Sequence, residues 1–399
     1  MSNPNDFKIP IVDLRAQYDQ IRTEISQTIE EVLASQRFVL GPAVERFERQ
    51  LATFLGCAYG IGVASGSDAL LLALMALGIG PGDAILVPTF TFFSTASSIT
   101  RLGAMPLFID SDPESYLIST KAVRGFIEEH CRFRGETLLE VKSALRVRTL
   151  MPVHLFGRCC SMTDLVALAR KYHLTIVEDV AQACGARYFM DDEWRLAGTL
   201  GDLGCFSFFP SKNLGGYGDG GFVTTGQQDL ANRVRILRVH GERTKYHHEL
   251  IGLNSRLDSI QAAVLSVKLR YLDAWCEQRI HHARYYSQLF NESGLLGRQI
   301  TCLPANSLEK SHVFNNYVIS VRRRDQLKSY LARHGIQSEI YYPVPLHLQS
   351  CFAHFGYKEG DFPVAELAAS QVLALPIYPE MTREQQQFVV GKVIDFFAG

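Results

Sequence analysis

Short apolar stretches alternate with amphipathic ones over residues 59–225 of this 399-residue chain. The runs "YGIGVAS", "AILVP", "AMPLFID" and "TIVEDVAQA" contain segments with the length of buried strands, and stretches with helical spacing such as "DALLLALMALG" lie between them. Regular alternation of strand and helix is typical of a mostly parallel sheet with helices on its faces. The pattern therefore predicts an α/β fold for this region.

The pattern changes on either side of this region. Residues 1–35 form a lead-in segment with a charged helix, and apolar spacing near 3.6 over residues 258–290 predicts one long connecting helix. After residue 300, short strands such as "NYVISV" mix with helices such as "RDQLKSYLARHG". We therefore expect a large α/β domain over residues 36–265 and a smaller α+β C-terminal domain over residues 266–399. The lead-in segment should pack near the smaller domain.

Composition narrows the class of protein. The net charge is −1, so the overall balance does not favour a nucleic acid or an anionic membrane as partner. No apolar run approaches membrane-spanning length. The nine cysteines include no C-x-x-C pair, which argues against a zinc ribbon and fits reduced core cysteines in a cytoplasmic protein. No metal site is expected either, because the pairs His247-His248 and His281-His282 lack further ligands at a suitable spacing.

A glycine-rich stretch invites a nucleotide-binding interpretation that its context opposes. Gly216, Gly218 and Gly221 fit G-x-G-x-x-G, the fingerprint of dinucleotide sites. That fingerprint must open a helix, whereas "GFVTTG" follows here and reads as a strand. No G-x-x-x-x-G-K-[ST] motif exists, so a P-loop is not supported either.

The stretch "VASGSDALLLAL" places polar residues where a strand gives way to a helix. Ser65 and Asp68 have the spacing of a helix cap, which is one interpretation. The other is a phosphate seat, because the free N–H groups of a first helical turn and the hydroxyl of Ser67 favour an anion. This stretch alone does not decide between the two.

Two further stretches place ionisable side chains after strands. "LTIVEDVAQACGA" ends a buried strand at Asp179, with Gln182 three positions on, where an acid suits a cationic ring nitrogen or simply caps a turn. Lys212 follows the strand "GCFSFF", whose apolar side chains could lower the lysine pKa and make it a nucleophile. An exposed loop lysine is the simpler alternative.

Taken together, these three stretches match the needs of one cofactor. Pyridoxal phosphate requires a seat for its phosphate, a carboxylate for its pyridine nitrogen and a lysine for a Schiff base. An aromatic ring should also cover it, and Phe92 in "PTFTFFST" lies at another strand end, although core packing would explain this residue equally well.

The sequence resembles the DegT/DnrJ/EryC1/StrS family, the nucleotide-sugar aminotransferases of aspartate-aminotransferase fold type I. The resemblance runs nearly end to end and rests on matching stretches in the right order. Among these are "FVLGPAVERFE", "VASGSDALLLAL", "GPGDAILVPTFTFFSTA", "PVHLFGR", "IVEDVAQACGA", "FSFFPSKNLGGYGDGGFV", "YHHELIGLNSRLDSIQAAVL" and "YYPVPLHLQ".

The resemblance implies a role for each matching position. Lys212 would be the Schiff-base lysine, and Asp179 would pair with the pyridine nitrogen. A homodimer with shared sites is implied as well, with Asn254 reaching the phosphate from the neighbouring subunit. The remaining implied cofactor contacts are the phosphate ligands Gly66, Ser67 and Ser207, the stacking Phe92, and Gln182 at the ring hydroxyl.

The resemblance also implies a reaction. Lysine at position 212, where dehydratases of the family have histidine, points to transamination, with glutamate as the expected amino donor. The subgroup resembled aminates C3 of UDP-linked 3-keto sugars for amino-sugar or surface-polysaccharide biosynthesis. Arg256, Tyr341 and Tyr342 are candidate sugar contacts, and a helix-start salt bridge or small-domain packing would explain them equally well.

Three alternatives and two departures from the family pattern remain. The substrate could be a 4-keto-6-deoxy sugar nucleotide or a cyclitol ketone, and the protein could instead be a non-catalytic regulator that binds the cofactor.

Ser67 replaces the usual threonine but retains the hydroxyl. The polar stretch 131–148 is longer than the family leads us to expect; we predict a surface excursion, and the sequence assigns it no role.

Overall fold

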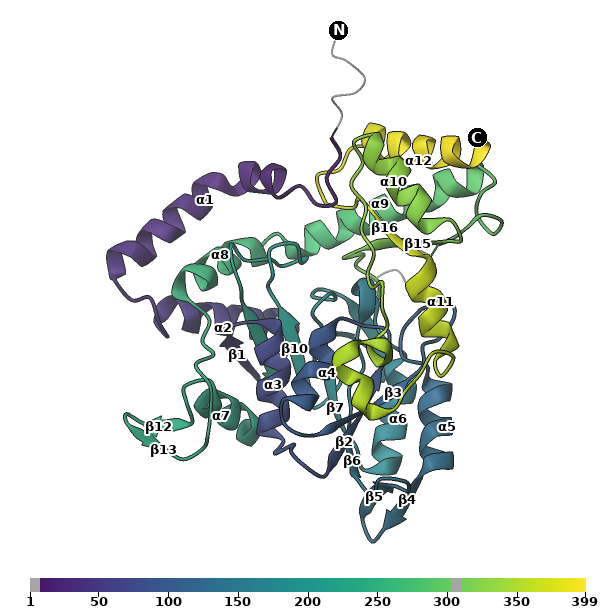
Figure 1. The fold of residues 1–399 in the computed structure, drawn as a ribbon. Coiled ribbons are helices and arrows are strands. Elements are labelled where there is room, and N and C mark those ends of the chain that lie inside the picture. The colour runs from purple at the N-terminus through teal and green to yellow at the C-terminus, as the bar shows by residue number, and fades with distance from the viewer. Residues whose placement is uncertain (1–7, 303–310) are drawn as a thin grey trace.

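The computed structural model of the protein describes residues 8–302 and 311–399, and a nine-stranded sheet lies at its centre (Figure 1). The main strand order is β1-β11-β10-β7-β6-β2-β3. The strands are β1 (Tyr59–Val63), β2 (Asp83–Pro88), β3 (Met105–Ile109), β6 (Arg146–Leu150), β7 (Thr175–Asp179), β10 (Leu203–Ser207) and β11 (Gly221–Thr225). From β10 to β3 all neighbours are parallel, and β11 is antiparallel to both of its neighbours. The predicted mostly parallel sheet is therefore confirmed.

Helices cover both faces of this sheet, so its strands are apolar on both sides. Successive residues of β10 show this, because Cys205 packs into one core cluster and Phe206 into the other. In β11, Val223 and Phe222 are divided in the same way. The flanking helices are α2 (Pro42–Leu55), α3 (Gly66–Ala76), α4 (Phe93–Thr100), α5 (Thr120–His130), α6 (Met162–Tyr172) and α7 (Gln228–Leu237).

The polar stretch 131–148 forms a hairpin that extends the sheet. Strands β4 (Cys131–Arg134) and β5 (Thr137–Glu140) pair with each other, and β5 joins β6 through Leu139 opposite Arg146. Figure 1 shows this hairpin at the end of the molecule opposite the C-terminus. Two more hairpins lie outside the main sheet. One consists of β8 (Arg187–Met190) and β9 (Glu193–Leu196), and the other consists of β12 (Glu242–Thr244) and β13 (His247–His248).

The single long helix predicted for residues 258–290 is wrong. The structure has α8 (Ser259–Leu269) and α9 (Leu272–Glu292), with a break at Arg270 and Tyr271. Tertiary contacts account for the break, since α8 packs on α1 (Leu14–Ser35) and α2, whereas α9 packs on α12 (Arg383–Ala398). At the break, Tyr271 stacks on Trp275 and its hydroxyl donates to Glu24 of α1. No glycine or proline marks this position, so periodicity could not reveal it.

A second, antiparallel sheet of three strands, here called the small sheet, lies beside α9. Its strands come from the C-terminal part of the chain. Ile9 belongs to its core cluster, whereas α1 (Leu14–Ser35) lies along α8. The division into domains at residue 265 stays a prediction, and residues 1–7 of the lead-in segment fall outside the described residues. The remaining elements are β14 (Ile300–Cys302), β15 (Tyr317–Val321), α10 (Arg324–Arg333), α11 (Pro363–Gln371), β16 (Val372–Leu375) and α12 (Arg383–Ala398).

Within the described ranges, no helix combines the length and the apolar character needed to cross a membrane.

Candidate active site

A cavity of about 430 Å³ lies between the carboxyl ends of β7 and β10 and the small sheet. Strand ends of this kind are where open α/β folds bind ligands. Asn254 and Arg256 do not line it within one chain. The other predicted site residues all do: Gly66, Ser67, Phe92, Asp179, Gln182, Ser207, Lys212, Tyr341 and Tyr342.

The start of α3 shows the helix cap and leaves room for the second interpretation, a phosphate seat. The Ser65 hydroxyl accepts the N–H of Asp68 at 3.1 Å, which makes Ser65 the helix cap. The Ser65 carbonyl accepts the N–H of Ala69 at 2.9 Å. The amides of Gly66 and Ser67 precede these bonds and have no partner within the helix. Capping therefore leaves two N–H groups and the positive end of the helix dipole for an anion.

Glycines allow this helix start to lie against the ends of β10 and β11. A Cβ on Gly66 would lie 2.5 Å from the Cβ of Ser207, and one on Gly221 would lie 2.2 Å from the Ser65 carbonyl oxygen. The close approach brings the Ser207 hydroxyl beside the α3 amides, and the Ser67 hydroxyl lies 2.6 Å from that of Ser94. Hydroxyls and amides gathered in this way suit a phosphate group.

Asp179 is buried at the end of β7 and is held on both oxygens. Its Oδ1 accepts the N–H of Ala181 at 3.1 Å, and its Oδ2 accepts the hydroxyl of Thr95 at 2.9 Å. Burial raises the pKa of the Asp179 carboxyl, and these hydrogen bonds together with Lys212 oppose the rise. A cationic ring nitrogen beside Asp179 would favour its ionised form further.

Glu178 points to the other side of β7, as the alternation of a strand requires. Its carboxylate accepts the N–H groups of Gly198, Leu200 and Gly201, and one oxygen lies 2.9 Å from Nε2 of the buried His154. Of the two adjacent acids, only Asp179 faces the cavity. Glu178 instead fixes the loop that leads into β10.

Lys212 lies in a tightly closed loop after β10. The N–H of Lys212 donates to the Phe209 carbonyl at 2.9 Å, and the N–H of Gly216 donates to the Phe208 carbonyl at 2.8 Å. A Cβ on Gly215 would lie 2.3 Å from the Pro210 carbonyl oxygen, so the glycine permits the closure. Burial lowers the pKa of Lys212 to about 8, although Asp179 acts in the opposite direction. The simpler interpretation, an exposed loop lysine, is wrong.

The lowered pKa of Lys212 predicts a pH dependence. With a pKa of about 8, about one amine in ten is neutral at pH 7, against about one in three thousand at the ordinary value. Only the neutral amine can attack an aldehyde, so incorporation of pyridoxal phosphate into the apoprotein should speed up with pH and level off above about 8. Stopped-flow absorbance across the pH range measures this, and a rate that keeps rising to pH 10 would contradict it.

Aromatic and amide groups close the cavity opposite the sheet. Phe92 is 52% exposed, and its ring lies 5.7 Å from that of Tyr342. Gln182 accepts the N–H of Phe156 at 2.6 Å through Oε1 and donates to the Tyr342 hydroxyl at 3.2 Å through Nε2. Phe92 is therefore free to cover a planar ring bound in the cavity. The two hydrogen bonds of Gln182 hold its side chain at the edge of the space that such a ring would occupy.

Sequence reasoning missed residues of the cavity wall, and it also missed Thr95, which lies behind the wall and binds Asp179. Thr95 lies one helical turn after Phe92, so its spacing could have indicated it, and its hydroxyl also lies 3.2 Å from that of Thr91. Asn315 and Asn316 precede β15 and carried no signal in the sequence, because nothing there related them to β7 or β10.

The family model of the DegT/DnrJ/EryC1/StrS aminotransferases matches residues 19–394. The chain belongs to this family. It is 43% identical to a Geobacillus stearothermophilus protein named pleiotropic regulatory protein, over 98% of this chain and 99% of the relative. It is 41% identical to UDP-N-acetyl-3-dehydro-α-D-glucosamine 3-aminotransferase of Acidithiobacillus ferrooxidans, over 94% and 95% of the two chains.

Solved structures of DegT/DnrJ/EryC1/StrS proteins and their relatives share the fold. DesV of S. venezuelae matches with a TM-score of 0.88 and 39% identity, over 98% of each chain. NtdA of Bacillus subtilis, solved with bound cofactor PMP, matches with a TM-score of 0.83 and 28% identity, over 98% of this chain and 83% of that one. The fold is thus fold type I of the pyridoxal phosphate-dependent transferases, and the predicted fold class and family are confirmed.

The family is pyridoxal phosphate-dependent, and the residues of this cavity fit that cofactor. The α3 amides with the Ser67 and Ser207 hydroxyls suit its phosphate, and the buried carboxylate of Asp179 suits its ring nitrogen. Lys212, with its lowered pKa, suits its aldehyde. The chain is therefore an aminotransferase whose cavity carries the groups that the cofactor requires.

Proposed function

We propose that this protein transfers an amino group from glutamate to C3 of a UDP-linked 3-keto sugar. The observation that carries the reaction type is the shared cavity of Lys212 and Asp179, with a phosphate seat at the start of α3. The substrate rests on similarity to the UDP-sugar 3-aminotransferase relative, which extends over nearly the whole chain.

In this reaction, the chain's own groups bind, orient and move protons. The bound cofactor supplies an electron sink next to the carbon that gains or loses the amine. Asp179 would keep the ring nitrogen of the cofactor protonated, and the α3 amides with Ser207 would hold its phosphate. Lys212 would hold the cofactor through its amine, and as a free amine it would carry a proton to or from the amino-acid α-carbon. Phe92 and Tyr342 would cover the face of the ring.

A substrate panel tests the proposal. The purified protein is incubated with glutamate and with UDP- and dTDP-linked 3-keto and 4-keto sugars, and the products are identified by mass spectrometry and NMR. Amination at C3 of a UDP-linked sugar is the expected result. Amination only of a 4-keto-6-deoxy sugar or a cyclitol ketone would support those alternatives instead.

The regulatory alternative is tested by glutamate alone. A relative of similar length bears the name of a regulatory protein, so the distinction matters. We expect glutamate to shift the visible absorbance of the cofactor-loaded protein, because Lys212 can yield its place to an amine. The absence of a shift would favour a binding protein without turnover.

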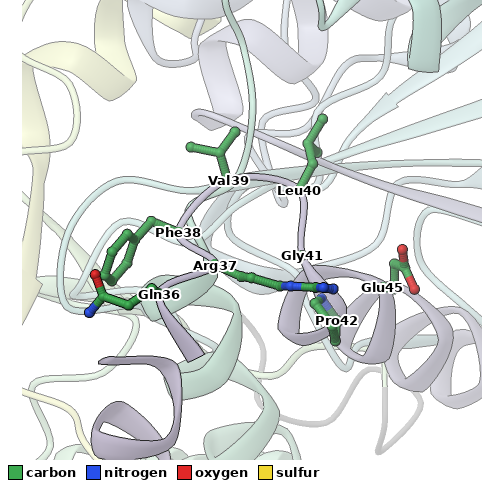
Figure 2. Close-up of a pocket in the computed structure, with 8 residues that line it drawn as sticks. All are labelled: Gln36, Arg37, Phe38, Val39, Leu40, Gly41, Pro42 and Glu45. Atoms are coloured by element: carbon green, nitrogen blue, oxygen red, sulfur yellow. The ribbon is translucent and has the colours of Figure 1, made fainter. Parts of the chain in front are cut away.

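We propose further that two copies of the chain complete each site. The groups that suit the phosphate within one chain are uncharged amides and hydroxyls. Asn254 is exposed and Arg256 is partly buried, and the bridge between Val39 and Asp258 connects their segment to the loop 36–42. That loop surrounds a separate hollow of about 630 Å³, and Figure 2 shows Val39 and Leu40 projecting from it.

Exposed apolar side chains on the segments that flank Asn254 suit contact with a second copy. Val39 is 50% exposed and Ile251 is 93% exposed. The hairpin of β12 and β13, with the exposed Tyr246 at its turn, projects from the body below α7 (Figure 1). Burial of these side chains against the partner would stabilise a dimer and carry Asn254 towards the partner's phosphate seat.

Subunit complementation should reveal a shared site. Lys212→Ala and Asn254→Ala are each expected to be nearly inactive as homodimers. After unfolding and refolding of an equal mixture, heterodimers contain one site with both native residues, so about a quarter of wild-type activity should return. Refolding each variant alone is the control. A mixture as inactive as its components would reject the shared site, and a monomer in analytical ultracentrifugation would reject the dimer.

A further inference from the structure

Asn315 carries an unpaired acceptor in the cavity wall. Its side chain is 6% exposed and lines the cavity, yet none of the described residues donates a hydrogen bond to its Oδ1. Its Nδ2 donates to Oδ1 of Asn316 at 2.8 Å, which fixes the orientation of the amide. An unpaired buried acceptor has lost its hydrogen bonds to water, so a ligand group that donates to it would restore one of them.

Close packing places Asn315 beside Gln182. A Cβ on Gly157 would lie 2.8 Å from the Asn315 backbone nitrogen and 3.1 Å from the Gln182 carbonyl oxygen, so only a glycine fits between the two segments. Gly157 also has a φ of +96°, which L side chains rarely adopt. Asn315 therefore faces the part of the cavity near Gln182 and Tyr342, away from the phosphate seat at Ser207.

Asn315 lies apart from the groups that suit the cofactor, which leaves it for the substrate. The groups that suit the cofactor come from the large sheet and its helices, whereas Asn315 and Asn316 directly precede β15, the central strand of the small sheet. The unpaired oxygen needs a hydrogen-bond donor. The carboxylates of glutamate, the phosphate of the cofactor and its ring oxygen in the ionised form offer only acceptors, and the amine of glutamate must point to the cofactor aldehyde instead. A sugar hydroxyl or the N–H of an acetamido group offers the donor that is required.

We propose that Asn315, held by Asn316, recognises a hydroxyl or acetamido N–H on a carbon next to the keto carbon of the substrate. This inference rests on the proposed function and narrows it to sugars that keep such a donor. A sugar deoxygenated at that carbon would leave Oδ1 of Asn315 buried and unpaired. The enzyme would therefore discriminate against it, as sites with buried polar groups do.

Reverse amination of matched substrates tests the proposal. The probes are UDP-3-amino-3-deoxyglucose and its 2-deoxy and 4-deoxy analogues, with 2-oxoglutarate as the acceptor of the amino group, and kcat/KM is measured for wild type, Asn315→Leu and Asn315→Ser. Wild type should lose about 10- to 100-fold on the analogue that lacks the recognised hydroxyl. Asn315→Leu should lose a similar factor on the parent sugar and nothing on that analogue. Asn315→Ser, which keeps an acceptor, should recover part of the preference.

The glutamate half-reaction separates recognition from a structural effect. Its rate, followed through cofactor absorbance, should fall far less in Asn315→Leu than the rate with the parent sugar, because glutamate offers no hydroxyl to this oxygen. Equal losses on all three sugars, or an equal loss in the glutamate half-reaction, would overturn the proposal. If wild type accepts both deoxy analogues as well as the parent, the proposal also fails. Conversion of no UDP sugar at all would reject the proposed function, and this inference with it.

Discussion

Replacement of Lys212 by alanine is expected to lower transamination by about 10⁴-fold or more. The variant loses both the amine that attaches the cofactor and the base that moves the proton. The phosphate seat and Asp179 remain, so pyridoxamine phosphate should still bind. Turnover with glutamate measures the loss, and equilibrium dialysis measures the binding.

A second buried lysine provides a matched control. Burial lowers the pKa of Lys268 to about 8 as well, but its Nζ donates to the Gly215 carbonyl at 2.8 Å and does not line the cavity. Lys268→Met should therefore retain activity within about tenfold, with a modest loss of stability from the released loop. Comparable inactivation of both variants would mean that burial, and not position, explains the effect. Appreciable turnover by Lys212→Ala would remove the basis of the proposed mechanism.

Asp179→Asn is expected to lower kcat by about 10³-fold with little change in folding. The amide keeps the size of the side chain, and Thr95 can rotate its hydroxyl to meet it. What disappears is the negative charge that keeps a ring nitrogen protonated. Single-turnover kinetics with glutamate measure the loss, and thermal unfolding measures the stability.

The neighbouring acid should behave in the opposite way. Glu178→Gln weakens charge-assisted hydrogen bonds from Gly198, Leu200 and Gly201, so it should lower the free energy of unfolding by about 1–3 kcal/mol. Its folded fraction should retain most of the activity, because Glu178 faces away from the cavity. If the two variants exchanged these phenotypes, the assignment of the two acids would be wrong.

Local patterns in the sequence predicted the elements and the principal ionisable groups. Apolar runs located the strands that end at Asp179 and Ser207, and strand ends meet at one edge of a parallel sheet. The strand pattern therefore sufficed to predict that Lys212, Asp179 and the start of α3 lie close together. The break at Arg270 was missed because its cause lies in contacts with α1 and α12, which are distant in the sequence.

The sequence by itself determined the family, the fold class and the residue types of the site, because these follow from motifs and from periodicity along the chain. Only the tertiary structure decided how those residues act. Burial lowers the pKa of Lys212, the pleat of β7 directs Asp179 to the cavity and Glu178 away from it, and Gly157 brings Asn315 beside Gln182. These properties depend on solvent exclusion and on contacts between distant segments, and no local pattern in the sequence encodes either.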